Sequence, residues 1–164
     1  MLPTYDEVLQ LTAGRSQVIP AEYIDSNGHL NVRHFVGIFD DCGTPLLLGL
    51  GMSREWLKEN HRGVMDLENH IRYIAEVLEG ETVSVYGRFI ERSPKAVHWM
   101  EFLVNDSRRN VAATLEMVTI HVDLDARKAI GWSDDVAKAM DAEIAKGAAL
   151  TWAAPISGCL AIKR

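Results

Sequence analysis

The 164-residue sequence predicts an α+β fold, in which one long helix packs against one large antiparallel sheet. The first observation is a helical period: apolar residues recur every three or four positions directly after a polar turn at 25–31. They are Val32, Phe35, Val36, Phe39 and Cys42. The second observation is that four long segments rich in β-branched and aromatic residues follow, joined by short links. Because this helix has a broad apolar face, we expect the sheet to wrap around it.

The first half of the chain contains this helix and one shorter element. A short strand is expected over 16–24, before the polar turn. The helix begins near Asn31, and Pro45 is expected to end or kink it. Gly37 and Gly43 are poor helix formers, so their presence indicates that the sheet approaches the helix closely at these positions.

The four sheet segments have the links of antiparallel hairpins. Short links join neighbouring antiparallel strands, so each segment is expected to pair with the next. The last segment is apolar on both faces, which is typical of a central strand, whereas 81–92 alternates and is a candidate outer strand. The segments are 63–78, 81–92, 95–105 and 110–124.

A final helix and an apolar tail close the chain. The helix is expected over 133–147, with Ser133 as its N-cap and acidic residues in its first turn. The tail from 148 to 164 has to pack on another surface because it is apolar. We expect one domain over 1–164, with its core at about 15–125 and the C-terminal helix and tail at 133–164.

The composition excludes several classes of protein. Hydrophobic residues make up 48% and charged residues 24% of the chain, which is ordinary for a soluble globular protein. The formal net charge of −6 argues against nucleic-acid binding. Cys42 and Cys159 fit no metal or redox spacing, which favours reduced thiols in the cytoplasm. The apolar run at 45–52 is too short to span a membrane, and no secretory signal begins the sequence.

The polar turn at 25–31 is richer in functional side chains than a turn requires. Asp25, Gly28, His29 and Asn31 form an Asp-x-x-Gly-His-x-Asn pattern that leads into the helix. This pattern and the order of elements resemble the hotdog-fold acyl-CoA thioesterases of the 4-hydroxybenzoyl-CoA thioesterase type. The resemblance implies a long central helix wrapped by a five- to six-stranded antiparallel sheet, with a C-terminal helix and tail.

A narrower resemblance is to the betainyl-CoA thioesterases of carnitine breakdown. Similar segments lie at 24–31, 68–74 and 113–124, and those proteins also carry a tryptophan in the tail. Tyr23 and Ser26 stand where those proteins usually have Trp and Tyr, so the acyl group stays open.

The resemblance implies hydrolysis of an acyl-CoA thioester, and the turn contains suitable groups for it. Asp25 is the only carboxylate of the motif, and it can attack the carbonyl or act as general base to water. His29 and Asn31 are expected to orient water, the carboxylate or the substrate. By resemblance, the backbone N–H of Val32 contacts the oxyanion, and Gly28 allows a close approach of the backbone.

Structural roles for the same residues stand beside these. Asp25 could simply close an Asx turn, and His29 could be a structural hydrogen-bonding group. Among other enzymes, a hotdog hydratase or dehydratase also pairs an Asp with a His. The pattern that we associate with those enzymes is Asp-x-Asn-Pro-x-His. This chain has Gly28 at the position of the Pro, and its His29 comes one residue earlier than the His of that pattern. A non-catalytic acyl-CoA-binding dimer is a third possibility, although loss of Asp25 would be its signature.

Two weaker candidates for substrate binding lie in the second half of the chain. Glu68 belongs to a strand that can border the pocket of a partner subunit, and Trp99 could contribute to an aromatic cage around a trimethylammonium group. No pair of histidines has the spacing of a metal site, so we expect no metal. No cofactor is expected, since coenzyme A enters as part of the substrate.

Coenzyme A carries phosphates that need cations. One basic cluster, of Arg88, Arg92 and Lys95, surrounds a predicted hairpin turn, and a second one lies at 108–109. One of these clusters is expected to hold the nucleotide end of the substrate.

The predicted sheet also leaves strand edges that need partners. Edges expose unpaired N–H and C=O groups, and the candidate outer strand 81–92 has few charges to protect it. We therefore expect a homodimer or a dimer of dimers, with the active site where two subunits meet.

Overall fold

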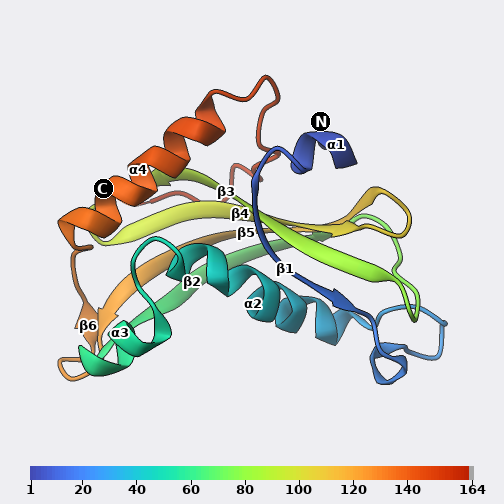
Figure 1. Cartoon of the computed structure of the whole chain (residues 1–164), viewed down its shortest axis with the longest axis horizontal. Helices are drawn as coiled ribbons and strands as arrows, with labels where there is room; N and C mark the ends of the chain where they lie inside the picture. Colours follow the sequence, from blue (N-terminus) through green and yellow to red (C-terminus); the bar gives the residue numbers. More distant parts are fainter. Residues whose placement is uncertain (163–164) are drawn as a thin grey trace. The chain divides into compact units, whose positions relative to one another are not determined.

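The computed structural model describes residues 1–162, so the last two residues of the predicted tail lie outside the described part. The predicted α+β class is confirmed, and Figure 1 shows the elements along the chain. In order they are α1 (Tyr5–Val8), β1 (Thr12–Val18), the 3₁₀ turn η1 (Ala21–Tyr23), α2 (Val32–Leu48), α3 (Arg54–Glu59), β2 (Arg62–Tyr73), β3 (Thr82–Arg92), β4 (Ala96–Asn105), β5 (Asn110–Asp123), β6 (Lys128–Ala129) and α4 (Asp134–Ala148).

The sheet differs from a simple series of hairpins. Its strand order is β1-β3-β4-β5-β2, and β6 pairs with β5. The central place of β5 is confirmed, but two expectations are wrong. The segment 81–92 (β3) lies between β1 and β4, and it does not pair with β2, because the link between these strands is a crossover. The length of a link does not reveal whether the two strands that it joins are neighbours in the sheet.

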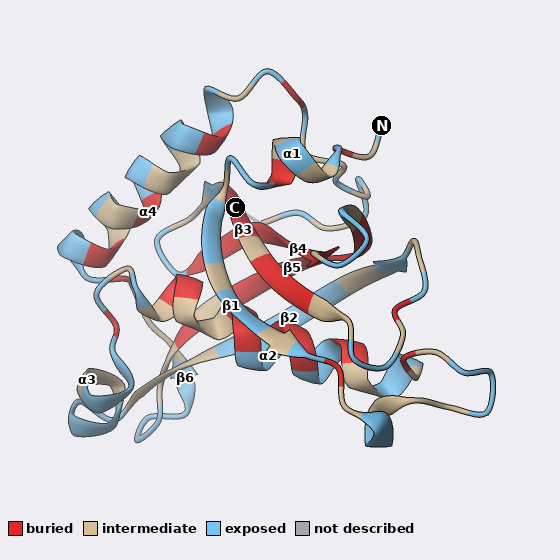
Figure 2. Ribbon diagram, turned by 45° about the vertical axis from the view of Figure 1, so that its right-hand side comes forward, coloured by how far each residue is buried: buried red, intermediate tan, exposed pale blue. Residues whose placement is uncertain are grey.

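The edges of the sheet are therefore β1 and β2, and they differ in burial from the centre. Every residue of β4 is buried, whereas β2 consists of exposed and intermediate residues, as the colours of Figure 2 show. Met65 and Leu67 on β2 are 56% and 52% exposed. An edge strand with exposed apolar side chains is open to pairing with another chain.

The chain divides into two compact units made of interleaved segments. The first contains Met1–Leu46, Ile71–Gly87 and Glu101–Leu115. The second contains Leu47–His70, Arg88–Met100 and the chain from Glu116 onward.

In the first unit, α2 buries one face, but not the whole stripe that the sequence predicts. Phe35 and Phe39 are buried as expected, and Ile38 joins them. Val32 and Val36 are instead 57% and 49% exposed. The period of apolar residues identified the helix correctly, but it could not say which of them the chain itself covers.

The sheet does approach α2 closely, at positions that differ in part from those expected. A Cβ atom on Gly14 of β1 would lie 2.2 Å from the carbonyl oxygen of Cys42, so only glycine fits there. A Cβ on Gly43 would meet the buried Glu101 carboxylate, whereas a Cβ on Gly37 would meet nothing within 4 Å. The expectation of a close contact is confirmed at Gly43 and is wrong at Gly37.

The boundaries of the other elements follow local chemistry. Pro45 lies inside α2, which continues to Leu48, so this proline does not end the helix. The expected strand at 16–24 ends at Val18, and a 3₁₀ turn takes the place of its second half. In the second unit α4 matches its prediction, since the Ser133 hydroxyl accepts the N–H of Val136 as an N-cap. No helix within residues 1–162 is long and apolar enough to cross a membrane.

Candidate functional site

The polar turn before α2 is held by its own backbone. The N–H of Asp25 donates to the carbonyl of His29 at 3.0 Å, and the N–H of Gly28 donates to the carbonyl of Asp25 at 3.0 Å. An isolated β-bridge between Ile24 and Leu30 closes the base of the turn. Gly28 has φ +82°, a conformation that side chains with a Cβ rarely adopt, so the glycine is required by the turn itself.

The Asp25 carboxylate serves the turn and also faces a cavity. Its Oδ1 accepts the N–H of Asn27 at 2.8 Å, which is the Asx turn that the sequence allowed. The same Oδ1 lies 3.9 Å from Nδ1 of His29. The side chains of Asp25 and His29 are 18% and 38% exposed, so the pair is partly screened from water but still accessible.

Asn31 lies at the start of α2, and its expected role in orienting water or substrate stays a prediction. Its Oδ1 accepts the N–H of Arg33 at 3.1 Å, and its carbonyl accepts the N–H of His34 at 3.0 Å. Asn31 therefore caps the start of α2, and its side-chain oxygen is engaged there. The His34 ring stacks on Tyr23 with centroids 4.0 Å apart, which ties the helix start to the preceding 3₁₀ turn.

An open cavity of about 360 Å³ lies beside the turn, within the first unit. Of the predicted residues, Asp25, His29 and Val32 line it, while Gly28 and Asn31 shape the turn without lining it. Its remaining lining residues are Leu30, Phe35, Tyr73, Ile74, Ala75 and Glu76.

The far wall of this cavity was missed by the sequence reasoning. Tyr73 ends β2 and contacts Phe35 edge-on with ring centroids 5.0 Å apart. Glu76 follows in the crossover and brings a second carboxylate, which lies 3.3 Å from the Arg108 guanidinium. Tyr73 and Glu76 are an aromatic and a charged residue in an otherwise apolar segment, and this contrast was a signal of a functional role. Only the crossover after β2 explains why both residues face the turn.

This arrangement contains the elements of acyl-transfer chemistry. A carboxylate and an imidazole line the same cavity as Val32, the first residue of α2. The N–H groups of a first helical turn have no partner inside the helix and carry its partial positive charge. A carbonyl oxygen that becomes negative is stabilised by such groups.

The other predicted binding residues belong to the second unit, and two of them are engaged inside the fold. Arg88 is only 8% exposed and donates to the carbonyls of Gly147 and Trp152 at 2.7 and 3.0 Å. Its guanidinium also lies over the Trp152 ring, 4.4 Å from the centroid. Trp99 is 3% exposed and stacks on Phe89, so it is a core residue. The predicted roles of Arg88 in phosphate binding and of Trp99 in an aromatic cage are therefore wrong.

The remaining basic residues are mostly paired. Arg92 forms a bidentate ion pair with Asp141, at 2.7 and 2.6 Å. At the second cluster, Arg108 pairs with Glu81, and Arg109 pairs with Asp6. Glu68 and Lys95 remain, and both line a second pocket, within the second unit.

Comparisons with known proteins agree with this geometry. The family model described as "Thioesterase-like superfamily" matches residues 19–140. A betainyl-CoA thioesterase of Pseudomonas aeruginosa is 25% identical over 132 residues, which cover 80% of this chain and 82% of that protein. An L-carnitine dehydrogenase/betainyl-CoA thioesterase of a Rhizobium species is 25% identical over 112 residues. That match covers 68% of this chain but only 22% of the relative, so the chain spans about a fifth of these longer proteins.

Solved structures share the fold. A hypothetical protein from Staphylococcus aureus, solved in complex with CoA, superposes with a TM-score of 0.80 at 19% identity and covers 93% of this chain and 97% of its own. A 1,4-dihydroxy-2-naphthoyl-CoA thioesterase from Synechocystis has a TM-score of 0.68 at 12% identity, with coverage of 79% and 95%. With the motif, the sheet order and the family match in agreement, this chain belongs to the thioesterase-like superfamily and has the hotdog fold.

Proposed function

We propose that this protein hydrolyses an acyl-CoA thioester to the free acid and CoA. The observation that carries the proposal is the cavity where Asp25 and His29 face the beginning of α2 in a member of a thioesterase family. Relatives and structural neighbours that are named thioesterases support the same reaction class.

Asp25 is the group that starts the reaction in this proposal. Its carboxylate either attacks the thioester carbonyl or removes a proton from the attacking water. In the first case an anhydride forms as the C–S bond breaks and CoA leaves as the thiolate, and water then hydrolyses the anhydride to the free acid and the Asp25 carboxylate. In both cases the carbonyl oxygen becomes negative, and the N–H of Val32 is the donor that stabilises it. The 3.9 Å distance between His29 and the carboxylate supports a role for His29 in orienting the water or the carboxylate.

The acyl group in this proposal is small and carries a positive charge. The cavity wall combines the aromatic rings of Phe35 and Tyr73 with the Glu76 carboxylate. Aromatic faces and a carboxylate attract a quaternary ammonium group. We therefore propose betainyl-CoA as the first substrate to test, which agrees with the names of the relatives.

The site is proposed to be completed by a second copy of the chain. Val32, Val36 and Tyr73 are about half exposed in the unit that holds the cavity, and no segment of the described chain covers them fully. Within residues 1–162, the edge strand β2 is also unpaired on one side. A homodimer would cover apolar side chains and satisfy strand groups at once.

The first experiment measures thiol release from a panel of acyl-CoAs. It compares betainyl-CoA with 3,3-dimethylbutyryl-CoA, a neutral analogue of nearly the same shape, and with benzoyl-, butyryl- and crotonyl-CoA. We expect turnover, with betainyl-CoA preferred over its neutral analogue by about tenfold or more, and this preference should fall in Tyr73→Leu. Hydration of crotonyl-CoA without thiol release would favour the hydratase, and binding of every CoA ester without reaction would favour the non-catalytic dimer.

Two further measurements address the finer points. Single-turnover hydrolysis in ¹⁸O-labelled water, followed by mass analysis of the peptide containing Asp25, tests the nucleophilic role. Label in the Asp25 carboxylate would establish the anhydride route, with water attacking the aspartyl carbonyl, because general-base catalysis puts the label only into the product acid. Light scattering at micromolar concentration should give at least twice the 18.3 kDa chain mass. A fully active monomer would overturn the shared site.

A further inference from the structure

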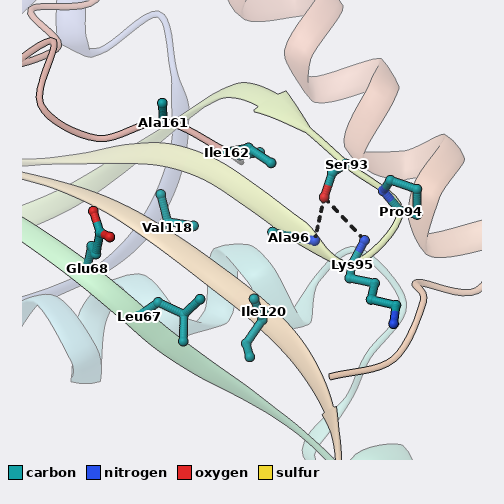
Figure 3. A pocket seen from close by; sticks show the side chains of 10 residues that line it. All are labelled: Leu67, Glu68, Ser93, Pro94, Lys95, Ala96, Val118, Ile120, Ala161 and Ile162. Carbon is teal, nitrogen blue, oxygen red and sulfur yellow. Dashed lines mark hydrogen bonds between the residues drawn. The ribbon is translucent and has the colours of Figure 1, made fainter. Parts of the chain in front are cut away.

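A second pocket lies between the sheet and the C-terminal tail, within the second unit. Its volume is about 490 Å³, and its walls are mostly apolar. Figure 3 shows Leu67 of β2 and Val118 and Ile120 of β5 on the sheet side, with Ala161 and Ile162 of the tail opposite. The pocket shares no lining residue with the cavity beside Asp25.

The tail that forms one wall is fixed to the sheet by a buried carboxylate. Glu116 is 1% exposed, and its Oε2 accepts the N–H of Ser157 at 2.7 Å. Its Oε1 lies 2.8 Å from Nε2 of His98, which is also buried. Burial raises the pKa of Glu116, but the hydrogen bonds from Ser157 and His98 outweigh it, and the pKa ends below its usual value. The wall is therefore held by a charge-assisted contact and is a built part of the pocket.

The polar groups of this pocket lie at two ends. Lys95 is exposed and forms no ion pair with any residue from 1 to 162, in contrast to Arg92 nearby. The Ser93 oxygen accepts the N–H of Lys95 and of Ala96, at 3.4 and 3.1 Å, which leaves its hydroxyl proton available as a donor. Figure 3 shows Glu68 at the opposite end of the pocket from Lys95.

We propose that this pocket binds a small monocarboxylic acid with an unbranched apolar chain. The carboxylate accepts hydrogen bonds from the Lys95 ammonium and the Ser93 hydroxyl. The chain of the acid covers the apolar side chains of Ile120 and Ile162, which are partly exposed, and lies beside Val118, which is 7% exposed. Glu68 at the far end repels a second carboxylate, so the pocket discriminates against dicarboxylic acids.

This proposal does not depend on the hydrolytic activity of the Asp25 cavity. Thioester hydrolysis also releases a carboxylic acid, but the acid proposed for the Asp25 cavity carries a trimethylammonium group, whereas this pocket is proposed to take an apolar chain. Binding is measured without any thioester, and its failure would leave the proposed reaction untouched.

The test is calorimetric titration of the full chain with octanoate, octanedioate, octylamine and octanol. We expect saturable binding of octanoate, with octanedioate and octanol weaker by at least tenfold. Lys95→Met should weaken octanoate by about tenfold or more, while the matched variant Lys128→Met, of an exposed lysine outside the pocket, should not. Glu68→Gln should bring the affinity for octanedioate closer to the affinity for octanoate.

Other occupants give distinct results. Equal binding of octanol and octanoate, or an unchanged affinity in Lys95→Met, would show a non-selective apolar surface and overturn the proposal. Preference for octylamine would assign the pocket to cations at Glu68 and would also overturn it. Absence of octanoate binding would overturn the proposal, and protection of Lys95 from acylation in the native oligomer would then assign the pocket to a second copy of the chain.

Discussion

Replacement of Asp25 by Asn tests the proposed chemistry with little change to the fold. Asn has the same shape, and its side-chain oxygen can still accept the N–H of Asn27, now 2.8 Å from Asp25 Oδ1. The backbone bonds to His29 and from Gly28 do not involve the side chain. The substitution therefore removes the negative charge and the basic oxygen while the turn keeps its hydrogen bonds.

The expected effects on rate and on stability differ widely. Loss of a general base or nucleophile is usually worth at least a hundredfold in rate, which corresponds to about 2.7 kcal/mol. The free energy of unfolding should change by less than about 1 kcal/mol, because one hydrogen bond to the backbone is at most weakened. The loss in turnover should thus exceed anything that unfolding explains.

Thiol release on the best acyl-CoA and urea unfolding measure the two quantities in the same preparations. Ser26→Ala is the matched control, since Ser26 is an exposed neighbour in the same turn and should keep its activity. Near-normal turnover of Asp25→Asn would refute the assignment. An equal loss in Ser26→Ala would show that the shape of the turn, rather than the carboxylate, limits the rate.

Four more predictions concern backbone shape and thiols. Gly28→Val should lower turnover by more than it lowers stability, because φ +82° costs about 1–2 kcal/mol for an ordinary residue and the turn would shift; unchanged kinetics would remove Gly28 from the site. Gly14→Ala should lower the free energy of unfolding by about 1–3 kcal/mol, since its Cβ would lie 2.2 Å from the Cys42 carbonyl oxygen. In the same denaturation assay Gly37→Ala should raise the free energy of unfolding by about 0.5–1 kcal/mol, because a Cβ atom at this position would have no neighbouring atom within 4 Å. With Ellman's reagent the native protein should react at the exposed Cys159 and not at Cys42, whose burial also raises the pKa of its thiol; rapid reaction of both would contradict the packing of α2.

The sequence predicted the turn and the helix well because their signals are local. Asp25 and Gly28 lie in one short motif, and the apolar period starts directly after it. The strands were also visible, because β5 in particular is apolar on both faces. The order of the strands depends on contacts between distant segments, and the crossover after Tyr73 left no mark in local composition.

The same reason explains which site residues were missed or wrongly assigned. Tyr73 and Glu76 reach the cavity only through the crossover. Arg88 was expected at the surface because it is charged, but its guanidinium is buried against the end of α4 and the Trp152 ring. Val32 is exposed although it belongs to the apolar period, because the period marks apolar residues and not the segments that cover them.

The place of β2 at the edge of the sheet has a consequence for synthesis on the ribosome. Its neighbour β5 begins at Asn110, 37 residues after β2 ends at Tyr73 (110 − 73). At roughly 5–20 residues per second, β2 leaves the ribosome about 2–7 seconds before the first residues of β5 leave it. During that time Met65 and Leu67 have no strand to pair beside them. The nascent chain therefore passes through a stage in which an apolar strand is a target for chaperones or for another nascent chain.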